Sequence, residues 1–593
     1  MTFEVAICLD DIGANNLVDP IVIYGNQDYY ISEITSTTVS QLTLPNCPLI
    51  LNNIPIGTTK LKIVDNNNLC AEIEIEEPQY FHFKIDTTKP GTTSNNQVKL
   101  PLISSGIYDI YVDWGDGGPW DNIKNWNDVK KTHTYASTGV YEIKIYSFPG
   151  NFIGWNYKID PSDRLKLLEI LKWGPIQLGN STGHFSACTN LNIPNVVDTL
   201  NTSGMTSFSS LFESCTSLSS INKVSQWDTS KVNNMSYTFK NATVFNSDLS
   251  GWTTNNVTTM QSMFESATQF NKNIGNWKTL FCADMQFMFA GATNFDNNGS
   301  DTINDWDTSS VTKMNYMFYN AYNFNRNIGK WNVSKVKFFG YMFHDAKKFN
   351  NNSSPTINNW NTSSAEEMGH MFFSTDKFNQ PLGNWNVKKV NTCCGFSQGL
   401  RSMFGSAVMF NQDLSNWDVS NVKTFRNMFN GASIFNNLGS PNISGWTTSA
   451  VTLMEGVFTN AVSFNQPIGS WDVSKVTTME SMFEGASQFN KDLSTWNVTG
   501  VTTMEDMFRN SSNFNQTLQT WKPINVTNLS GFLSGSSFSI TNYNNLLIDW
   551  SVLTLKPNVQ MNVSQNYNNI ASSAKSILTS APNNWIIIDN GLI

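Results

Sequence analysis

The segment FNQPIGSWDVSKVTTMESMFEGASQFNKDLSTWNVTGVTTMEDMFRNSSNFNQ, residues 464–516, repeats its own pattern. FNQPIGSW returns as FNKDLSTW, and KVTTMESMF returns as GVTTMEDMF. The Trp of this pattern recurs along the chain at residues 227, 252, 277, 306, 331, 360, 385, 417, 446, 471, 496 and 521. A fixed period of about 25 residues is typical of a repeat array whose units stack into a solenoid.

Four of the spacings between these Trp residues are longer than 25 and show where the coils carry insertions. Spacings of 29 residues hold their extra residues directly after a Phe-Asn or Phe-Asp pair, near Asn297, Asn351 and Asn437. One spacing of 32 residues holds its extra residues in VNTCCGFSQGLRSMF, Val390–Phe404. Insertions at one fixed point of a repeat map to loops on one face, so this last insertion is expected on a different part of the coil.

Recognition is expected at these irregular loops, because loops held on a rigid scaffold commonly carry binding residues. The repeated Trp, Met and Phe are instead predicted to point inward and to fill stacked rows of the core. The candidate binding residues of the longest insertion are Cys393, Phe396, Gln398 and Arg401.

Each unit also has a local pattern. The i, i+3, i+4, i+7 spacing of a helical stripe is met by Met479, Met482, Phe483 and Ala486. This spacing predicts about two helical turns per coil, followed by a short extended segment at IGSWDVS. One such coil buries too little apolar surface alone, so stacked coils must bury it together. The Asn after each Phe is predicted to satisfy backbone groups of the turn through its amide.

Regions outside the repeats are predicted to be β-rich or to cap the array. Strand-like stretches occur in IVIYG, LILNNI and TKLKIVDNNNLCAEIEIEE, with a hairpin turn around Asp65–Asn68, and on both sides of DWGDGG. We therefore expect a mixed α/β repeat solenoid of about 13 coils of 25 residues, preceded by two β-sandwich-like domains. The predicted domains are a β domain at 1–78, a β-sandwich at 79–150, an entry cap at 151–204, the solenoid at 205–540 and a C-terminal cap at 541–593.

Composition and charge argue against several classes of protein. The chain has 593 residues, a formal net charge of −9, 14% charged residues and no run of Lys or Arg, so nucleic acid is not an expected partner. No apolar run approaches the length of about 18 residues that spans a bilayer, so membrane insertion is not expected. The five His are scattered, and HExxH, GxSxG and P-loop motifs are missing from the sequence. We therefore expect no enzyme activity and no cofactor.

Two groups of residues admit more than one interpretation. Asp113 and Asp116 in DWGDGG are candidate ligands for calcium, but a tight turn whose carboxylates accept backbone N–H bonds is favoured. The eight Cys form no CxxC pair, which argues against zinc. Cys188 and Cys215 occupy the slot that Ala fills in other coils, so we predict buried thiols and leave a disulfide between them open.

The unit V-T-x-M-x-x-M-F-x-x-A-x-x-F-N-x-x-[IL]-x-x-W-[DN]-V-S resembles the BspA-like leucine-rich-repeat surface proteins of the DUF285 type, in Bacteroidetes or phage proteins. YVDWGDG together with HTYASTGVYEIKI resembles a PKD-like module of immunoglobulin type, which this family often places before its repeats. LEILKWG and the ending NYNNLLIDW…NNWIIIDNGLI resemble the family's entry segment and terminal cap. The resemblance covers residues 80–593 and implies a leucine-rich-repeat-like, surface-displayed scaffold for adhesion, without catalytic residues.

We accordingly expect a non-enzymatic adhesion or recognition scaffold that contacts a protein or glycan of a host surface. The N-terminal MTFEVAICLDDIGANN has neither the basic region nor the apolar core of a secretory signal, which favours a phage or viral virion appendage, such as a fibre or a tail or head decoration. Residues 1–78 would then join other virion structural proteins, and self-association into a homo-oligomer stays open. A bacterial cell-surface or secreted adhesin is the first alternative. A polysaccharide depolymerase that uses paired acids is the second.

Overall fold

The protein is described from a computed structural model, which defines residues 2–7, 21–25, 29–34, 49–55, 60–64, 70–74, 79–390 and 399–593. The chain forms two compact units. The N-terminal unit comprises Met1–His184, Asn190–Gly204 and Ile221–Lys223, and the C-terminal unit comprises Phe185–Thr189, Met205–Ser220 and Val224–Ile593.

The N-terminal unit begins with two antiparallel sheets. Their strands are β1 (Thr2–Ile7), β2 (Ile21–Gly25), β3 (Tyr29–Ile34), β4 (Leu49–Pro55), β5 (Lys60–Val64) and β6 (Cys70–Glu74). Strand β1 pairs with β4, and a four-stranded sheet has the order β3-β2-β5-β6. The pairing of Val64 with Cys70 closes an antiparallel β5-β6 hairpin, as the sequence predicted.

A second group of strands follows in the same unit. It consists of β7 (Gln79–Asp86), β8 (Gln97–Lys99), β9 (Leu102–Tyr108), β10 (Ile110–Asp113), β11 (Asp121–Ile123), the 3-10 helix η2 (Val129–Lys131), β12 (Thr132–Thr134), β13 (Val140–Ser147), β14 (Phe152–Trp155) and β15 (Leu167–Lys172). The main sheet has the order β11-β10-β13-β7-β15, while β12 pairs with β8 and β14 with β9. The alternation of β7 turns Phe81 and Phe83 inward, where both rings lie edge-on to Trp155 at 5.2 and 5.4 Å. The predicted strands on both sides of DWGDGG are confirmed as β10 and β13, and β15 adds a strand from the segment predicted as an entry cap.

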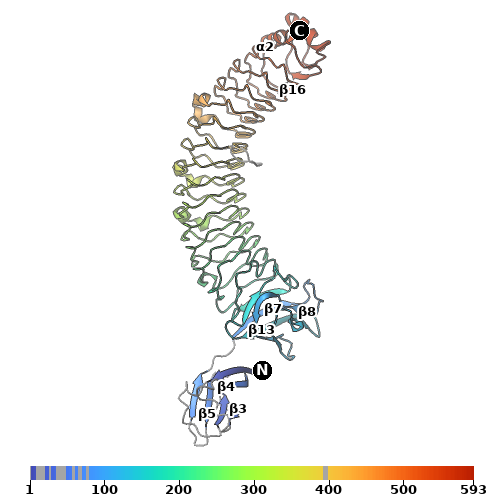
Figure 1. The fold of residues 1–593 in the computed structure, drawn as a ribbon. Coiled ribbons are helices and arrows are strands. Elements are labelled where there is room, and N and C mark those ends of the chain that lie inside the picture. The colour runs from blue at the N-terminus through green and yellow to red at the C-terminus, as the bar shows by residue number, and fades with distance from the viewer. Residues whose placement is uncertain are drawn as a thin grey trace. The chain divides into compact units, whose positions relative to one another are not determined.

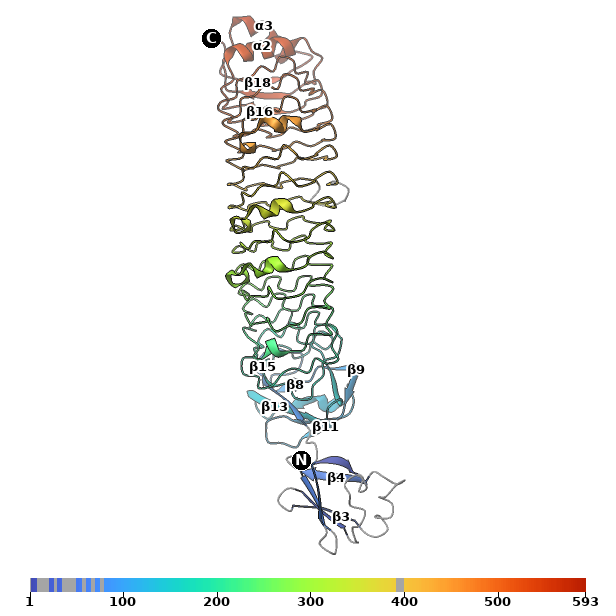
Figure 2. The same ribbon diagram turned by 90° about the vertical axis from the view of Figure 1, so that its left-hand side faces the viewer.

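The repeated residues of the C-terminal unit form coils that lie one above another (Figures 1 and 2). Adjacent coils are joined by parallel single-residue bridges. The bridges run Ser207–Asn234–Thr259–Asp284–Lys313–Phe338–Glu367 and Thr424–Leu453–Thr478–Thr503–Asn528. Because each bridge joins residues one repeat apart, equivalent residues of successive coils lie next to each other.

The predicted helical turns at Met479–Ala486 are wrong. Ser481 and Gly485 have φ of 52° and 67°, which no right-handed helix accommodates. The backbone N–H groups of Ser481 and Phe483 donate to carbonyls of the next coil, at Glu505 (2.8 Å) and Met507 (2.9 Å). The segment is therefore a chain of tight turns that bonds to its neighbour. The IGSWDVS segment forms no paired strand either, because the bridge lies later in the coil, at Thr478.

The inward rows agree with the prediction. Every repeated Trp is buried, with between 1 and 4% of its surface exposed. Trp306 and Trp331 stack with ring centres 6.0 Å apart and planes at 3°, and the Trp331 Nε1–H donates to the Ile303 carbonyl of the previous coil at 2.9 Å. The predicted buried thiols are confirmed at Cys188 and Cys215, which form no disulfide with each other.

A row of Asn side chains connects the coils at the position after each repeated Phe. The Asn325 Oδ1 accepts the backbone N–H groups of Asn350 (2.8 Å) and Asn352 (3.0 Å) in the next coil. Equivalent bonds begin at Asn246, Asn271, Asp296, Asn350, Asn379, Asn411, Asn436, Asn465, Asn490 and Asn515. The predicted role of this amide in satisfying the backbone is confirmed, although its bond crosses between coils instead of closing its own turn.

The C-terminal segment contains helices and parallel strands. They are β16 (Leu529–Leu533), α2 (Ile540–Ser551), β17 (Gln560–Val563), the 3-10 helix η10 (Asn569–Ala571), α3 (Ser572–Thr579) and β18 (Ile586–Ile588). The helices α2 and α3 followed by β18 confirm the predicted helical and then extended pattern, and Leu547 and Trp550 of α2 are buried. Among the described residues, none of the helices has the length and apolar composition needed to span a bilayer.

Candidate binding surface

Each four-residue insertion forms two short 3-10 helices. They are η4 (Asn297–Gly299) with η5 (Asp301–Asp305), η6 (Asn351–Ser353) with η7 (Pro355–Asn359), and η8 (Asn437–Gly439) with η9 (Pro441–Gly445). A further 3-10 helix of the coils, η3 (Val224–Gln226), lies outside the insertions. The insertions line up along one edge of the coils, in green, yellow-green and orange in Figure 1, as their shared position in the repeat predicted.

Each insertion is anchored by a buried Asn in the left-handed region. The Asn297 Oδ1 accepts the Ile274 N–H of the previous coil at 2.9 Å, and its Nδ2 donates to the Ser300 carbonyl at 2.7 Å. Asn351 and Asn437 make the same two bonds, accepting a backbone N–H of the previous coil and donating to a carbonyl of their own insertion. The insertions are therefore built into the stack, and only their outer residues are available to a ligand.

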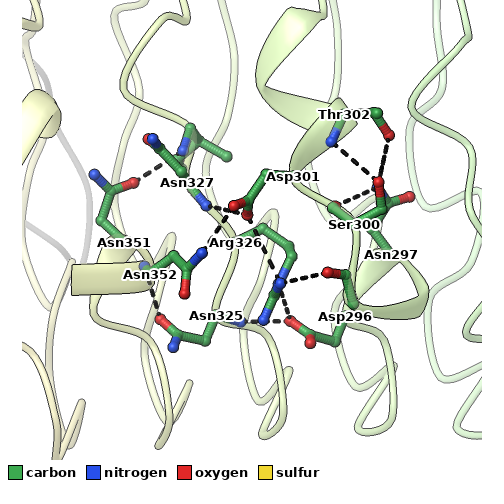
Figure 3. A network of polar contacts seen from close by, with 12 residues as sticks. Asp296, Asn297, Ser300, Asp301, Thr302, Asn325, Arg326, Asn327, Asn351 and Asn352 are labelled. Atoms are coloured by element: carbon green, nitrogen blue, oxygen red, sulfur yellow. Dashed lines mark hydrogen bonds and ion pairs between the residues drawn. The ribbon is translucent and has the colours of Figure 1, made fainter. Parts of the chain in front are cut away.

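Arg326 connects the first insertion to the following coil (Figure 3). Its Nε donates to Asp296 at 2.9 Å, and its Nη1 donates to the Gly299 carbonyl at 2.7 Å and lies 3.7 Å from Asp301. Asp301 in turn accepts the Asn352 Nδ2 at 2.8 Å, so it also connects the first insertion to the second. This network fixes a cation at the surface in one geometry.

Arg326 directly follows Asn325 of the Asn row, in a slot that other coils fill with other residue types. The residue in the same slot elsewhere is often Gln, whose amide donates to the Asn row of the previous coil, as in Gln380, Gln412, Gln466 and Gln516. Arg326 makes the same kind of bond to Asp296 and adds a charge. This charge is paired with the Asp296 and Asp301 carboxylates, whereas the Gln residues of the other coils bond to a neutral Asn.

Arg326 borders a polar hollow of about 530 Å³, which we call the amide hollow. It is lined by Asn246, Gln269, Asn271, Asn294, Asp296, Asn323, Asn325, Arg326 and Lys348. The Asn271 and Asn325 amide oxygens are occupied by backbone N–H groups, which leaves their amide N–H groups to face a ligand. Together with Arg326 and Lys348, these donors suit a ligand rich in hydroxyl or carboxylate oxygens. The lining holds no hydroxyl, thiol or imidazole that could act as a nucleophile.

The candidate residues of the longest insertion are placed only in part. Arg401 lies in the coil next to His370, whose backbone N–H donates to the Arg401 carbonyl at 2.8 Å. The Arg401 Nε is buried and has no hydrogen-bond acceptor within the described residues. Cys393, Phe396 and Gln398 lie outside the described residues. Arg401 is not among the residues that line the amide hollow.

The structure favours the turn interpretation of Asp113 and Asp116. Their carboxylates accept the backbone N–H groups of Gly115 and Gly118, each at 3.0 Å. Asp116 also lies 2.9 Å from the His133 Nε2. Burial alone would raise the pKa of Asp116, but these two partners hold it below its ordinary value. Among the described residues, no three His, Cys, Asp or Glu side chains come together to hold a metal ion.

Sequence reasoning missed the residues that depart from the repeat at half-buried and exposed slots. Asp296 and Arg326 are two of them. Leu280 and Phe281 are two more, with 45 and 57% of their surfaces exposed, and they line a hollow of about 420 Å³ with Trp277. Other coils place polar pairs in this slot, such as Ser-Lys after Trp471. An alignment of the coils slot by slot gives the signal, because an exposed slot has no packing reason to change character.

Repeated units, a small mixed content of strands and short helices, and a β-rich N-terminal region define the chain as a modular repeat protein. It belongs to the family described as "Mycoplasma protein of unknown function, DUF285", which matches residues 180–302, 295–398, 353–441 and 437–550. No curated protein and no solved structure matches the chain.

Proposed function

We propose that the chain is a non-enzymatic recognition scaffold, in which a leucine-rich-repeat-like solenoid displays binding residues on its outer slots. One observation carries this proposal. The inward slots hold the same Trp, Met and Phe in coil after coil, whereas the outward slots change from coil to coil. Repeated residues are committed to stacking, so specificity falls to the exposed ones.

The ligand class follows from the amide hollow. Its donors are side-chain amides, Arg326 and Lys348, held in place by bonds between coils. Such a surface is suited to an acceptor-rich partner, such as a glycan or an acidic segment of a protein on a host surface. Binding of this kind requires no chemistry from the protein, in keeping with a role in adhesion.

The test is the attachment of purified protein to candidate target cells and to an array of surface glycans and extracellular proteins. Arg326→Gln introduces the residue type that Gln380, Gln412, Gln466 and Gln516 place in this slot, and it should weaken attachment by roughly tenfold, the equivalent of one charge-assisted contact. Arg509→Gln is the matched control, because Arg509 is an exposed Arg in a distant coil paired only with Asp506 of its own coil. Wild-type protein that attaches to none of these targets would contradict the proposal. Equal attachment by both variants would remove the amide hollow from it.

We further propose that the scaffold is displayed on a virion, with residues 1–78 as the attachment region and a PKD-like module after it. The two antiparallel sheets formed by β1 to β6 support this division, because they share no strand with the main sheet of residues 79–172. Protein lacking residues 1–78 should fold and keep its ligand binding but fail to enter particles. Normal incorporation would contradict display through this region and would favour a cell-surface or secreted adhesin.

A further inference from the structure

Four successive coils place large rings in a slot that most other coils fill with small or polar residues. The slot is the second residue after the first Met of M-x-x-M-F, and it has a left-handed backbone in every described coil. Ser262, Ser402, Asn427, Gly456, Ser481 and Asp506 occupy it elsewhere, and Tyr237 occupies it near the start. Between residues 287 and 370 the occupants are Phe287, Tyr316, Tyr341 and His370, with φ between 58° and 59°. Large side chains are strongly disfavoured in this region of the backbone map, where Gly, Asn and Asp are at ease.

The four rings stack along the coils. Phe287 and Tyr316 have ring centres 4.5 Å apart, Tyr316 and Tyr341 4.6 Å, and Tyr341 and His370 4.4 Å, with planes within 8° in each pair. Stacking returns some of the stability that the backbone conformation costs. It does not explain the choice of rings, because the coils with Ser, Asn or Gly in this slot stack equally well.

A second row of rings lies beside the first. Tyr319 and His344 have centres 5.1 Å apart, and His344 and Phe373 4.7 Å. The rows touch each other, for example between Tyr341 and His344 at 5.4 Å. We call these seven rings the aromatic strip: Phe287, Tyr316, Tyr341, His370, Tyr319, His344 and Phe373.

The aromatic strip lies outside the core of its coils. In the coil of Phe287 the inward slots are filled by Met285, Met288 and Phe289, which are fully buried, while Phe287 itself is half-buried. The other rings of the strip are likewise half-buried. Tyr316, Tyr341 and His344 therefore have a ring neighbour on both faces, the rings at the ends of the two rows have one, and each ring keeps part of its surface in solvent.

The strip is electrically neutral near pH 7. Burial, together with His344 and Arg401, lowers the pKa of His370 to about 4, and burial outweighs Asp345 in lowering that of His344. Burial raises the pKa of Tyr316 to about 12. At its border Asp345 is paired with Lys347 at 3.2 Å. The strip thus combines apolar ring carbons, phenol hydroxyls and neutral imidazoles without a net charge.

We propose that the aromatic strip binds a neutral glycan chain laid along the stack of coils. Ring edges carry partial positive charge, and phenol and imidazole groups donate hydrogen bonds, so both favour the oxygen atoms of a sugar. The apolar ring carbons suit its C–H groups. Because each coil presents an equivalent ring, successive sugar units meet the same chemistry, which favours a polymer over a single sugar. Nucleic acid is disfavoured, because base stacking needs free ring faces and the chain has a net charge of −9.

This inference rests on the proposed role in recognition and is tested separately from it. The probes are soluble neutral polysaccharides, such as a β-glucan, a mannan and a galactan, with polygalacturonate as the charged comparison. Binding is measured by titration calorimetry on the full chain. The test variant combines Tyr316→Asn and Tyr341→Asn, which introduces a residue type that Asn427 shows the slot accepts. Asn tolerates the left-handed backbone better than Tyr does, and this gain offsets the lost stacking of the rings. The variant should therefore fold with a melting temperature within a few degrees of wild type.

Wild type should bind at least one neutral polysaccharide more tightly than polygalacturonate, and the double variant should bind it at least tenfold more weakly. Asp506→Asn, in the same slot of a distant coil, is the matched control and should bind as wild type does. Undiminished binding by the double variant would overturn the inference. Wild type that attaches to cells but binds no neutral polysaccharide would also overturn the inference. Attachment to a protein receptor through the strip would overturn it as well. In both cases the proposed role in recognition would stand. A chain that attaches to no cell, glycan or protein would overturn both.

Discussion

Replacement of Trp331 by Ala tests the inward rows on which the whole interpretation of the coils depends. Trp331 is 2% exposed, stacks on Trp306 and donates its Nε1–H to the Ile303 carbonyl. Truncation of a buried Trp costs about 3–5 kcal/mol. The stacked pair accounts for about 0.5–1.5 kcal/mol of this, and the hydrogen bond for about 1 kcal/mol. We expect a loss near the middle of this range, because the Ile303 carbonyl keeps the Trp306 backbone N–H as a donor at 3.3 Å.

A global melting curve is a poor assay, because a modular repeat protein does not unfold as one two-state unit. Native-state hydrogen exchange measures the loss where it occurs. A loss of about 4 kcal/mol should speed exchange roughly 10³-fold at amides that join this coil to its neighbours, such as Met314 and Phe339. Amides in distant coils, such as Phe483, should exchange as in wild type.

Two further substitutions at this place sharpen the test. Trp331→Phe keeps a stacking ring but removes one of the two donors of the Ile303 carbonyl, which retains the Trp306 N–H at 3.3 Å, so about 0.5–1.5 kcal/mol should be lost. Lys330→Ala removes an exposed side chain paired only with Asp305 and should change local stability by less than about 0.5 kcal/mol. Unchanged exchange at Met314 and Phe339 in the Trp331→Ala protein would refute the claim that the buried Trp row stabilises the contacts between neighbouring coils.

Other predictions concern the Asn row, the aromatic strip and the N-terminal unit. Asn325→Ala should cost about 1–3 kcal/mol because two backbone N–H groups of the next coil lose their acceptor, whereas Asn325→Asp, the residue type of the preceding coil, should be nearly neutral by hydrogen exchange. Because the pKa of His370 is about 4 in the folded chain and 6.5 in its reference state, the unfolded chain takes up a proton first as pH falls. The contribution of His370 to stability should thus be full above pH 6.5 and lost down to pH 4. His370→Asn should flatten this fall in native-state hydrogen exchange of its coil, measured at several pH values and corrected for the intrinsic exchange rate at each pH. Lys166→Met should destabilise the N-terminal unit by about 3–5 kcal/mol in urea unfolding, because it leaves the fully buried Asp163 carboxylate without its cation. Lys166→Met with Asp163→Leu should recover only part of the loss, because the Lys99 backbone N–H, which donates to Asp163 at 2.7 Å, then loses its acceptor.

The sequence by itself determined the period of the coils and the identity of the inward rows. Trp, Met and Phe return at the same slots, and an apolar side chain that recurs in every unit has no other place than the shared core. The same logic placed the three insertions together, since they enter the repeat at one point. It also identified the amide after each Phe as a structural group, because Asn commonly satisfies the backbone in turns.

Only the tertiary structure decided the backbone conformation and the exposed sites. The spacing of Met479, Met482 and Phe483 is that of a helix. However, the backbone N–H groups of Met479, Ser481 and Phe483 donate to carbonyls of the adjacent coil. A single coil contains no such partners, so its local pattern says nothing about the left-handed slot at Ser481. For the same reason Tyr316 and Tyr341, 25 residues apart, become a stacked pair at 4.6 Å, and Arg326 reaches Asp296 at 2.9 Å, 30 residues earlier. The period tells which residues share a row, but the direction in which a row faces depends on hydrogen bonds that exist only between coils.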